Sequence, residues 1–406
     1  MTIWYGELTA DCELPDYEEC ELEDVDLDGD CGNAGMEMDL LSKELLPGLP
    51  EDVALECLVR VSMSAFPQLQ GVCRRWGQLV CSKDFYEERK KAGTTRNCVC
   101  IVQALPDAPD QSAGSPGVKH TTAPEFGITV YDWQNQSWSR IPCIPEFPSG
   151  LPLFCRLVAV DGKLLVLGGW HPDTYEALKS VYVFDFTSQL WKGCADMPCS
   201  RSFFACGALD GQVYVAGGHD DNKNALNTAE VYNLEENRWE VLPNMSEARD
   251  ESGGIVLDGK FFVISGYGTS NQGQFTSSAD SYDPITGEWT RIEDMWTEGV
   301  SPGPFAVSQG VLYAVQRQNL VHYAKESNAW AVVEKIPGEG RFANWITSTE
   351  AGILMMTLPS TADRNKSLIH QRPAGAVSAE DRSSWQLVET SDMFSGLGRA
   401  ACTVDI

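Results

Sequence analysis

The sequence predicts a mainly β protein: a six-bladed β-propeller, preceded by a small all-α domain and an acidic disordered tail. Three observations support this fold class. The apolar spacing changes from helical to strand-like near Asn97, Asp-Gly turns and glycine pairs then recur, and a tryptophan returns in each repeat. The predicted boundaries are 1–42 for the tail, 43–92 for the helical domain and 98–406 for the propeller.

The tail is predicted from its charge. Residues 1–42 contain no Lys or Arg but many Asp and Glu, so repulsion between like charges and a lack of core-forming residues favour disorder. The segment 24–29 begins like a calcium-binding loop, with oxygen ligands at alternate positions. Its twelfth position should supply a bidentate Glu but is Gly35, so no calcium site is expected.

Bulk composition narrows the possible partners. A formal net charge of −28 disfavours nucleic acid and anionic membranes, which both attract clustered Lys and Arg. No apolar run approaches the length of a membrane span and no secretion signal opens the chain, so we expect a protein of the cytoplasm, the nucleus or both. The 14 cysteines fall singly, without a Cys-x-x-Cys pair, which is typical of reduced thiols rather than disulfides or metal ligands.

The helical domain follows the tail. Pro50, with the acidic Glu51 and Asp52, suits the first turn of a helix. Apolar residues then recur at helical spacing, and Ser82 is a candidate cap for a further helix. On the first helix, the residues expected to share one face are Val53, Cys57, Leu58 and Val61. On the second helix they are Leu69, Val72, Cys73, Trp76 and Val80. Because so small a core is marginal alone, we expect a partner to cover the remaining apolar side chains.

The propeller is predicted from its repeats. An Asp-Gly turn precedes a short apolar strand, a glycine-rich turn ends that strand, and a loop, a third strand and a tryptophan follow. A single sheet of this size cannot bury both of its apolar faces, whereas sheets stacked around an axis can. The Asp-Gly turns are Asp161-Gly162, Asp210-Gly211 and Asp258-Gly259. The tryptophans are Trp138, Trp191, Trp239, Trp289, Trp330 and Trp385.

The sequence also predicts how the ring of blades is closed. The first repeat lacks the strand that precedes the turn in the others, and residues 399–405 read like residues 204–210. The C-terminal strand is therefore predicted to complete the first blade. The pattern is weaker in the fifth repeat, where residues 313–316 lack the double glycine, and in the sixth, which carries a polar stretch around residues 359–384.

The candidate binding residues lie in and beside three polar loops. The loops begin at Trp170, His219 and Tyr267, each directly after a glycine-rich turn, and we expect them to meet a ligand at one mouth of the channel. Arg201 and Arg249 each stand nine residues before the Asp of a turn. Paired guanidinium groups could grip a carboxylate-bearing peptide there, although structural salt bridges are the favoured explanation for two such arginines.

Enzymatic functions lack their usual signals. The chain has five histidines, without the paired spacing that metal sites use: His120, His171, His219, His322 and His370. No nucleophile elbow, phosphate loop or dinucleotide fingerprint occurs. We therefore expect no catalytic residue, no metal and no cofactor.

The helical segment resembles an F-box. Residues 46–58, Leu-Pro-Gly-Leu-Pro-Glu-Asp-Val-Ala-Leu-Glu-Cys-Leu, followed by the Val-Cys-Arg-Arg-Trp string at residues 72–76, carry the likeness. The resemblance implies docking on a Skp adaptor and, through it, on a cullin; an unrelated helical bundle is the alternative. The adaptor contacts that it implies are Leu49, Pro50, Val53, Leu55, Leu58, Val72 and Trp76.

The double-glycine, Tyr and Trp spacing resembles the kelch repeat, and the whole chain resembles plant F-box/kelch proteins, above all the Kiss-me-deadly family. Strings that look shared are residues 150–158, 201–204 and 249–251. This resemblance implies a non-catalytic, substrate-recognising subunit of a ubiquitin ligase, acting on phenylalanine ammonia-lyase or type-B cytokinin response regulators. The alternatives are an F-box scaffold without ligase output and a kelch metalloenzyme. The long acidic extension is unlike that family, which leaves open a regulatory tail or a misplaced start codon.

Overall fold

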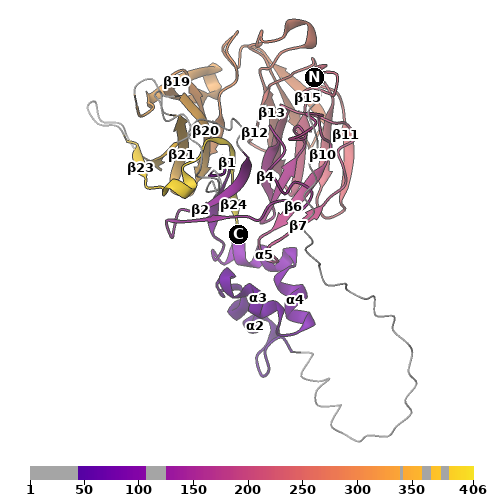
Figure 1. Ribbon diagram of the computed structural model, residues 1–406, viewed down its shortest axis with the longest axis vertical. Coiled ribbons are helices and arrows are strands. Elements are labelled where there is room, and N and C mark those ends of the chain that lie inside the picture. The colour runs from indigo at the N-terminus through magenta and orange to yellow at the C-terminus, as the bar shows by residue number, and fades with distance from the viewer. Residues whose placement is uncertain (1–43, 107–124, 339–341, 359–366, 376–383) are drawn as a thin grey trace, which may run out of the picture. The chain divides into compact units, whose positions relative to one another are not determined.

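The structure is a computed structural model that describes residues 44–106, 125–338, 342–358, 367–375 and 384–406. The predicted tail and its calcium-like segment lie outside these residues, as does His120. Within them, six four-stranded antiparallel sheets confirm the predicted propeller (Figure 1). No helix in the described ranges is both long and apolar enough to cross a membrane.

Each sheet is one blade, and the innermost strands of neighbouring blades contact each other around the ring. Numbered along the chain and given from innermost to outermost strand, the blades are as follows: first, β24 (Gly398–Asp405), β1 (Asn97–Ala104), β2 (Phe126–Asp132) and β3 (Ser137–Arg140); second, β4 (Arg156–Val160), β5 (Lys163–Leu167), β6 (Val181–Asp185) and β7 (Leu190–Gly193); third, β8 (Ala205–Leu209), β9 (Gln212–Ala216), β10 (Ala229–Asn233) and β11 (Arg238–Leu242); fourth, β12 (Gly253–Leu257), β13 (Lys260–Ile264), β14 (Ala279–Asp283) and β15 (Glu288–Ile292); fifth, β16 (Phe305–Ser308), β17 (Val311–Gln316), β18 (Asn319–Ala324) and β19 (Ala329–Lys335); sixth, β20 (Phe342–Thr349), β21 (Gly352–Leu358), β22 (Leu368–Pro373) and β23 (Gln386–Val388).

The Asp-Gly turns have the backbone that their sequence demands. Asp161 and Gly162 both adopt positive φ, at 47° and 71°, as the type I′ hairpin turn requires. The equivalent turns at Asp210 and Asp258 repeat these angles. Because this turn matches the right-handed twist of the flanking strands, it fixes the register between the two innermost strands of the second, third and fourth blades.

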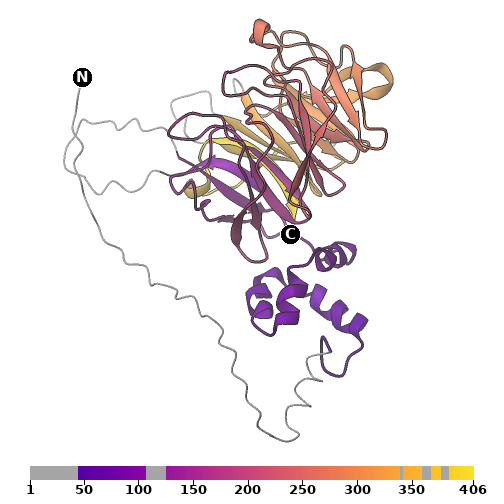
Figure 2. The same ribbon diagram turned by 90° about the vertical axis from the view of Figure 1, so that its right-hand side faces the viewer.

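The C-terminal strand closes the ring as predicted. β24 pairs with β1 in antiparallel register from Asn97 opposite Asp405 to Val102 opposite Ala400. The purple first strand and the yellow last strand lie side by side in Figure 1, and Figure 2 shows the same strand running to the chain end marked C. The first blade is therefore assembled from both ends of the propeller sequence.

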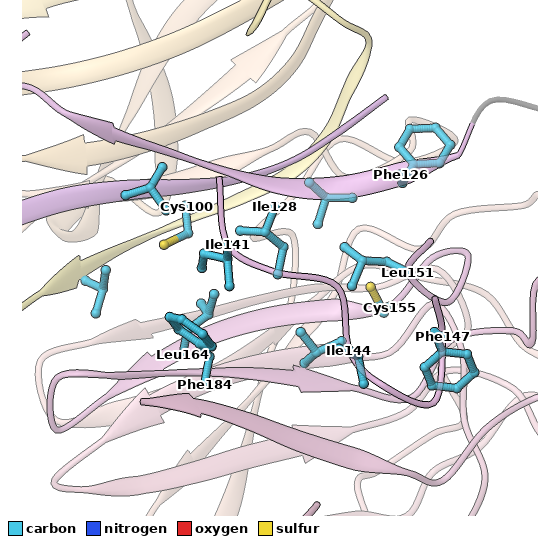
Figure 3. Close-up of a cluster of buried hydrophobic side chains, with 14 of the residues drawn as sticks. Cys100, Phe126, Ile128, Ile141, Ile144, Phe147, Leu151, Cys155, Leu164 and Phe184 are labelled. Atoms are coloured by element: carbon cyan, nitrogen blue, oxygen red, sulfur yellow. The ribbon is translucent and has the colours of Figure 1, made fainter. Parts of the chain in front are cut away.

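The core lies between the blades. Cys100 and Ile128 of the first blade pack with Leu164 and Phe184 of the second, and Figure 3 shows this cluster. Leu164 and Phe184 are fully buried. Side chains of this kind contribute about 1.5–3 kcal/mol each when they leave water, so stacking the blades is what stabilises sheets that are too small to fold singly.

Five of the repeated tryptophans join their blade to the preceding one. Each lies on or just before the outermost strand, and five donate their indole N–H to a carbonyl just beyond the outermost strand of the preceding blade. Trp191 to Pro142 O and Trp289 to Pro243 O both measure 2.7 Å. Trp138 reaches Glu389 O of the sixth blade at 3.4 Å, across the closure of the ring.

We expect Trp239→Phe to destabilise the propeller by about 1–3 kcal/mol, because it leaves a carbonyl without its donor while keeping an aromatic ring. Trp239 donates to Ala195 O at 2.9 Å and packs on Tyr232. Thermal unfolding of wild type and variant measures the change. An unchanged midpoint would mean that water replaces the indole at no cost.

The weak fifth repeat has a structural reason. β17 and β18 are joined by Arg317 and Gln318 alone, with Arg317 in the left-handed region at φ 55°. A hairpin this short leaves no loop like those that follow β5, β9 and β13. The double glycine is absent because there is no loop for it to redirect.

The small helical domain contains α2 (Glu51–Val59), α3 (Phe66–Gln70), α4 (Arg74–Val80) and α5 (Lys83–Lys91), with a 3₁₀ turn at Met63–Ala65. Ser82 caps α5 by accepting from Phe85 N at 3.2 Å, as predicted. The buried Arg89 donates to Val59 O at 2.9 Å and Val61 O at 2.8 Å, and so satisfies carbonyls at the end of α2.

Two expectations about these helices are wrong. The predicted second helix is divided, because the chain leaves helical geometry between Gly71 and Cys73 and restarts at Arg74. On α2 the buried residues are Ala54, Leu58 and Val59, whereas Val53 and Cys57 are exposed. Apolar residues lie on both sides of this helix, so spacing alone could not tell the core from the surface.

Candidate functional site

Three consecutive blades place an equivalent residue at one mouth of the propeller. Trp170, His219 and Tyr267 follow the turns after β5, β9 and β13, and each forms a bridge with the segment before an innermost strand. The turns are tight. A Cβ on Gly169 would lie 2.5 Å from Leu153 O, so only glycine fits there.

These three residues line one pocket of about 160 Å³, together with Phe203, Asp250 and Glu251. The structure thus brings together residues that the sequence predicted as separate members of one site. The imidazole of His219 stacks on Phe203 with ring centroids 5.4 Å apart, and the Trp170 centroid lies 5.7 Å from Phe203 and 5.9 Å from His219. That they contact a substrate stays a prediction.

Phe203 and Glu251 are pocket residues that the sequence analysis did not single out. Both adopt left-handed backbone, with φ of 55° and 49°, and Phe154 occupies the equivalent position in the second blade with φ of 57°. A non-glycine residue costs about 1–3 kcal/mol in such a conformation and is often found at a functional site. The sequence offered one signal for these residues, their position in the repeat: Phe203 comes two residues after Arg201, and Glu251 comes two residues after Arg249.

A hydrogen-bond chain holds the pocket wall. Trp170 Nε1 donates to Ser202 Oγ at 2.9 Å, Ser202 Oγ lies 2.8 Å from His219 Nε2, and His219 Nδ1 lies 2.9 Å from Asp250 Oδ2. When Nδ1 carries the imidazole proton and donates to Asp250, Nε2 is free to accept from the Ser202 hydroxyl. This series of hydrogen bonds fixes the orientation of two rings of the pocket, those of Trp170 and His219.

A catalytic triad of a hydrolase is also connected from Ser to His to Asp by hydrogen bonds. The position of Ser202, however, does not suit a nucleophile. Ser202 is fully buried, is not part of the pocket lining, and its hydroxyl already accepts from the Trp170 indole. A nucleophile has to reach its substrate. We therefore assign Ser202 and Asp250 a positioning role.

Arg201 and Arg249 do not lie at the mouth, which corrects the expectation that they grip a peptide. Both are buried, at 0 % and 1 % exposure. Arg201 pairs with Glu230 at 2.7 Å, and Arg249 pairs with Asp280 at 2.8 Å and Glu247 at 2.9 Å. Burial raises the pKa of Glu230 and the neighbouring Arg201 partly offsets this effect. The structural salt-bridge alternative is the one that the geometry supports.

Different arginines line the channel beside the pocket. Arg156 and Arg399 belong to the innermost strands β4 and β24 and border a cavity of about 370 Å³ that also includes Phe203 and Glu251. Arg156 Nε donates to Phe204 O at 2.7 Å, and the Arg399 guanidinium lies 4.5 Å from the Phe126 ring centroid. Burial lowers the pKa of both arginines. A positive subsite thus adjoins the pocket across Phe203.

The residues predicted to contact the adaptor differ in exposure. Leu49, Val53 and Val72 are 39 %, 42 % and 59 % exposed, and Pro50 is exposed as well. Leu55 and Trp76 are half-buried. Exposed apolar side chains on a small domain indicate a protein-binding surface. Leu58 is an exception at 3 % exposure: it belongs to the domain's own core, so a direct contact is wrong for this residue.

The surroundings of the described cysteines and possible metal ligands bear on thiol and metal chemistry. No group of three or more His, Cys, Asp or Glu there could hold a metal ion. Burial raises the pKa of Cys98, Cys155 and Cys206 to about 12, so these thiols stay protonated and pack as small apolar groups.

A six-bladed propeller with an aromatic pocket, joined to a small helical domain that exposes apolar side chains, defines a modular β-propeller protein. The chain belongs to the F-box/kelch-repeat family. The family model for the FKB95 kelch-repeats domain matches residues 124–369, and the F-box domain model matches residues 46–88.

Relatives agree with this family assignment, and a solved structure agrees with the propeller fold. F-box/kelch-repeat protein At1g15670 of Arabidopsis thaliana is 36 % identical over 89 % of this chain and 100 % of its own length. F-box/kelch-repeat protein At1g80440 of the same plant is 40 % identical over 73 % of this chain and 83 % of its own. The solved structure of YjhT matches with a TM-score of 0.51, over 64 % of this chain and 90 % of that one; at 13 % identity it supports the fold alone.

Proposed function

We propose that this protein is the substrate-recognising subunit of a Skp-cullin-F-box ubiquitin ligase. The observation that carries the proposal is the union, in one chain, of an F-box domain with exposed apolar side chains and a kelch propeller with an aromatic pocket at its mouth. The first part would bind the Skp adaptor and the second would bind the protein to be modified.

The protein would act by proximity. Tethering a substrate beside the ubiquitin-charged enzyme turns an encounter between separate molecules into an intramolecular one with a high effective concentration. The ligase chemistry then belongs to other subunits. Because this role needs the ubiquitin machinery and the proteasome, the proposed location is the cytoplasm, the nucleus or both.

Candidate substrates follow from the resemblance to the Kiss-me-deadly family. They are phenylalanine ammonia-lyase, which would give control of phenylpropanoid synthesis, and type-B cytokinin response regulators. The sequence strings that look shared with that family support testing these substrates. Two of the strings, residues 201–204 and 249–251, contribute Phe203, Asp250 and Glu251 to the pocket.

Co-purification tests the proposal. Full-length protein is expressed in plant cells with the proteasome blocked, beside Leu49→Ala/Pro50→Ala and, as a matched control, Leu190→Ala, which truncates an exposed Leu on β7. We expect wild type and control to recover Skp adaptor, cullin and a substrate, and the double variant to keep only the substrate. Failure of the wild type to recover adaptor would contradict the F-box role.

Substrate turnover separates a ligase receptor from a scaffold. Deleting the gene should stabilise the recovered substrate if the protein is a ligase receptor, whereas a scaffold without ligase output would leave its lifetime unchanged. This comparison needs no assumption about which substrate is recovered.

A further inference from the structure

We infer that the pocket formed by Trp170, Phe203, His219, Glu251 and Tyr267, here called the aromatic cup, receives a basic side chain, Arg or Lys, of the bound substrate. The inference rests on the proposed function and names the chemistry of the ligand. Three features of the cup carry it: its rings, its carboxylate and a lysine of this chain that already lies against it.

The rings provide the first argument. Trp170, Phe203 and His219 lie within 6 Å of each other by centroid, and Phe203 and Trp170 are only partly buried, so ring surface faces the pocket. A cation over an aromatic face is attracted by the ring quadrupole, most strongly over Trp and more when water is excluded. The hydrogen bond from Trp170 to Ser202 keeps the indole in place.

The carboxylate provides the second argument. Glu251 Oε1 accepts from the Tyr267 hydroxyl at 2.8 Å. Burial, and then this hydrogen bond, raise the pKa of Tyr267, so the phenol stays neutral and donates. Within the part of the chain that the structure describes, no cation pairs with Glu251. Glu251 therefore lines both the cup, of about 160 Å³, and the neighbouring cavity of Arg156 and Arg399, and its carboxylate forms no ion pair with either arginine. Asp250, in contrast, is already bonded to His219.

The third argument is that a cation of this chain occupies the cup's edge. Lys223 Nζ lies 5.8 Å from the Trp170 ring centroid. Lys223 lies in the exposed loop after His219, with φ of 60°, and its backbone N–H donates to Asp220 O at 2.9 Å. This lysine marks where an ammonium group is favoured, and a substrate's basic side chain would take its place.

Charge around the cup agrees with this ligand. The net charge of −28 steers basic segments toward the protein. On the other side of Phe203, Arg156 and Arg399 would repel a cation from the channel and so confine it to the cup. The opposite ligand, an acidic side chain, would instead favour those two arginines, and the experiment separates the two.

Ligand-observed NMR with the full-length chain tests the inference. The probes are blocked pentapeptides Gly-Gly-Xaa-Gly-Gly with Arg, Lys, Gln or Glu at the centre. We expect saturation transfer to the Arg and Lys peptides and none to the Gln and Glu peptides. Binding of the Glu peptide alone, or of none of the four, would overturn the inference.

Variants locate the binding. Glu251→Gln keeps an acceptor for Tyr267 but removes the charge, and it should weaken Arg-peptide binding about tenfold. Its matched control is Glu298→Gln, an exposed carboxylate outside the cup. Lys223→Gln should strengthen binding severalfold by removing the competing cation, whereas Lys192→Gln on β7 should not. Equal effects from the cup variants and their controls would count against the site.

The same variants keep the two proposals distinguishable. In the co-purification described above, Glu251→Gln should lose substrate while it retains Skp adaptor and cullin. If Glu251→Gln retains the substrate, the cup is not where the substrate binds, yet the receptor function stands. If wild type recovers no adaptor while basic peptides still bind the cup, the receptor function fails and the ligand assignment survives.

Discussion

Replacing Arg249 with Met is expected to destabilise the propeller by about 3–5 kcal/mol, because it strips the partner from a buried carboxylate. Asp280 is fully buried and pairs with Arg249 Nε at 2.8 Å. The same guanidinium donates to the carbonyls of Ser265 at 2.9 Å and Ser278 at 3.0 Å, so these acceptors also lose their donor. Urea unfolding followed by tryptophan fluorescence measures the loss.

The matched control is Arg238→Met. Arg238 is also ion-paired, with Glu236 and Glu240, but its side chain is 59 % exposed, so water replaces the lost partner and little change is expected. Adding Asp280→Leu to Arg249→Met should restore part of the stability, since no charge is then left buried alone. If the two Arg→Met variants unfold alike, the buried pair does not hold the fourth blade.

Removing residues 398–406 should abolish cooperative folding of the propeller. This deletion takes away β24, which pairs with β1 along its length and contacts β4 and β20 of the neighbouring blades. The first blade would lose its innermost strand and expose the backbone edge of β1, which invites aggregation. Size-exclusion chromatography and thermal unfolding would show the loss.

A point variant tests closure with the chain intact. Val404→Asp places a carboxylate at a position of 2 % exposure, at a cost of several kcal/mol, whereas Val332→Asp makes the same change at a position of 65 % exposure and should be tolerated. A synthetic peptide with the sequence of residues 398–406 should rebind the truncated chain by strand addition. A truncated chain that unfolds as cooperatively as wild type would contradict the closure.

Much of the fold could be predicted because its requirements are local. A type I′ turn needs positive φ at two residues, which Asp161-Gly162 supplies, and the double glycine at Gly168-Gly169 admits a neighbouring backbone that a Cβ would block. The closing strand was recognisable because residues 399–405 copy an internal repeat. Each signal lies within a few residues of the structure that it specifies.

The roles of Arg201 and Arg249 depended on partners far along the chain. Glu230 and Asp280 lie about 30 residues beyond them, and the same arginine spacing fits a channel mouth or a buried pair. One sequence signal was overlooked. Each carboxylate is the second residue of a strand whose first four residues are all buried, and the other three of these carry apolar or small side chains. A buried acid needs a cation.

The candidate site was predicted in part. Trp170, His219 and Tyr267 meet because equivalent positions of consecutive blades share one mouth, which follows from the repeat. Phe203 and Glu251 were missed because left-handed backbone at a non-glycine residue leaves no trace in hydrophobic periodicity. Leu58 was misplaced because α2 has apolar residues on both sides.

A left-handed residue before the innermost strand of the second, third and fourth blades makes this part of the mouth modular. Phe154, Phe203 and Glu251 project from the same backbone conformation in three successive blades, yet one of them is a carboxylate and two are benzyl groups. Since the backbone conformation at this position is common to all three, the scaffold can exchange the side chain without rebuilding the sheet behind it. Each of these three blades therefore presents one side chain that can be exchanged, and Phe203→Glu should change which ligand the pocket binds while the unfolding temperature stays near that of wild type.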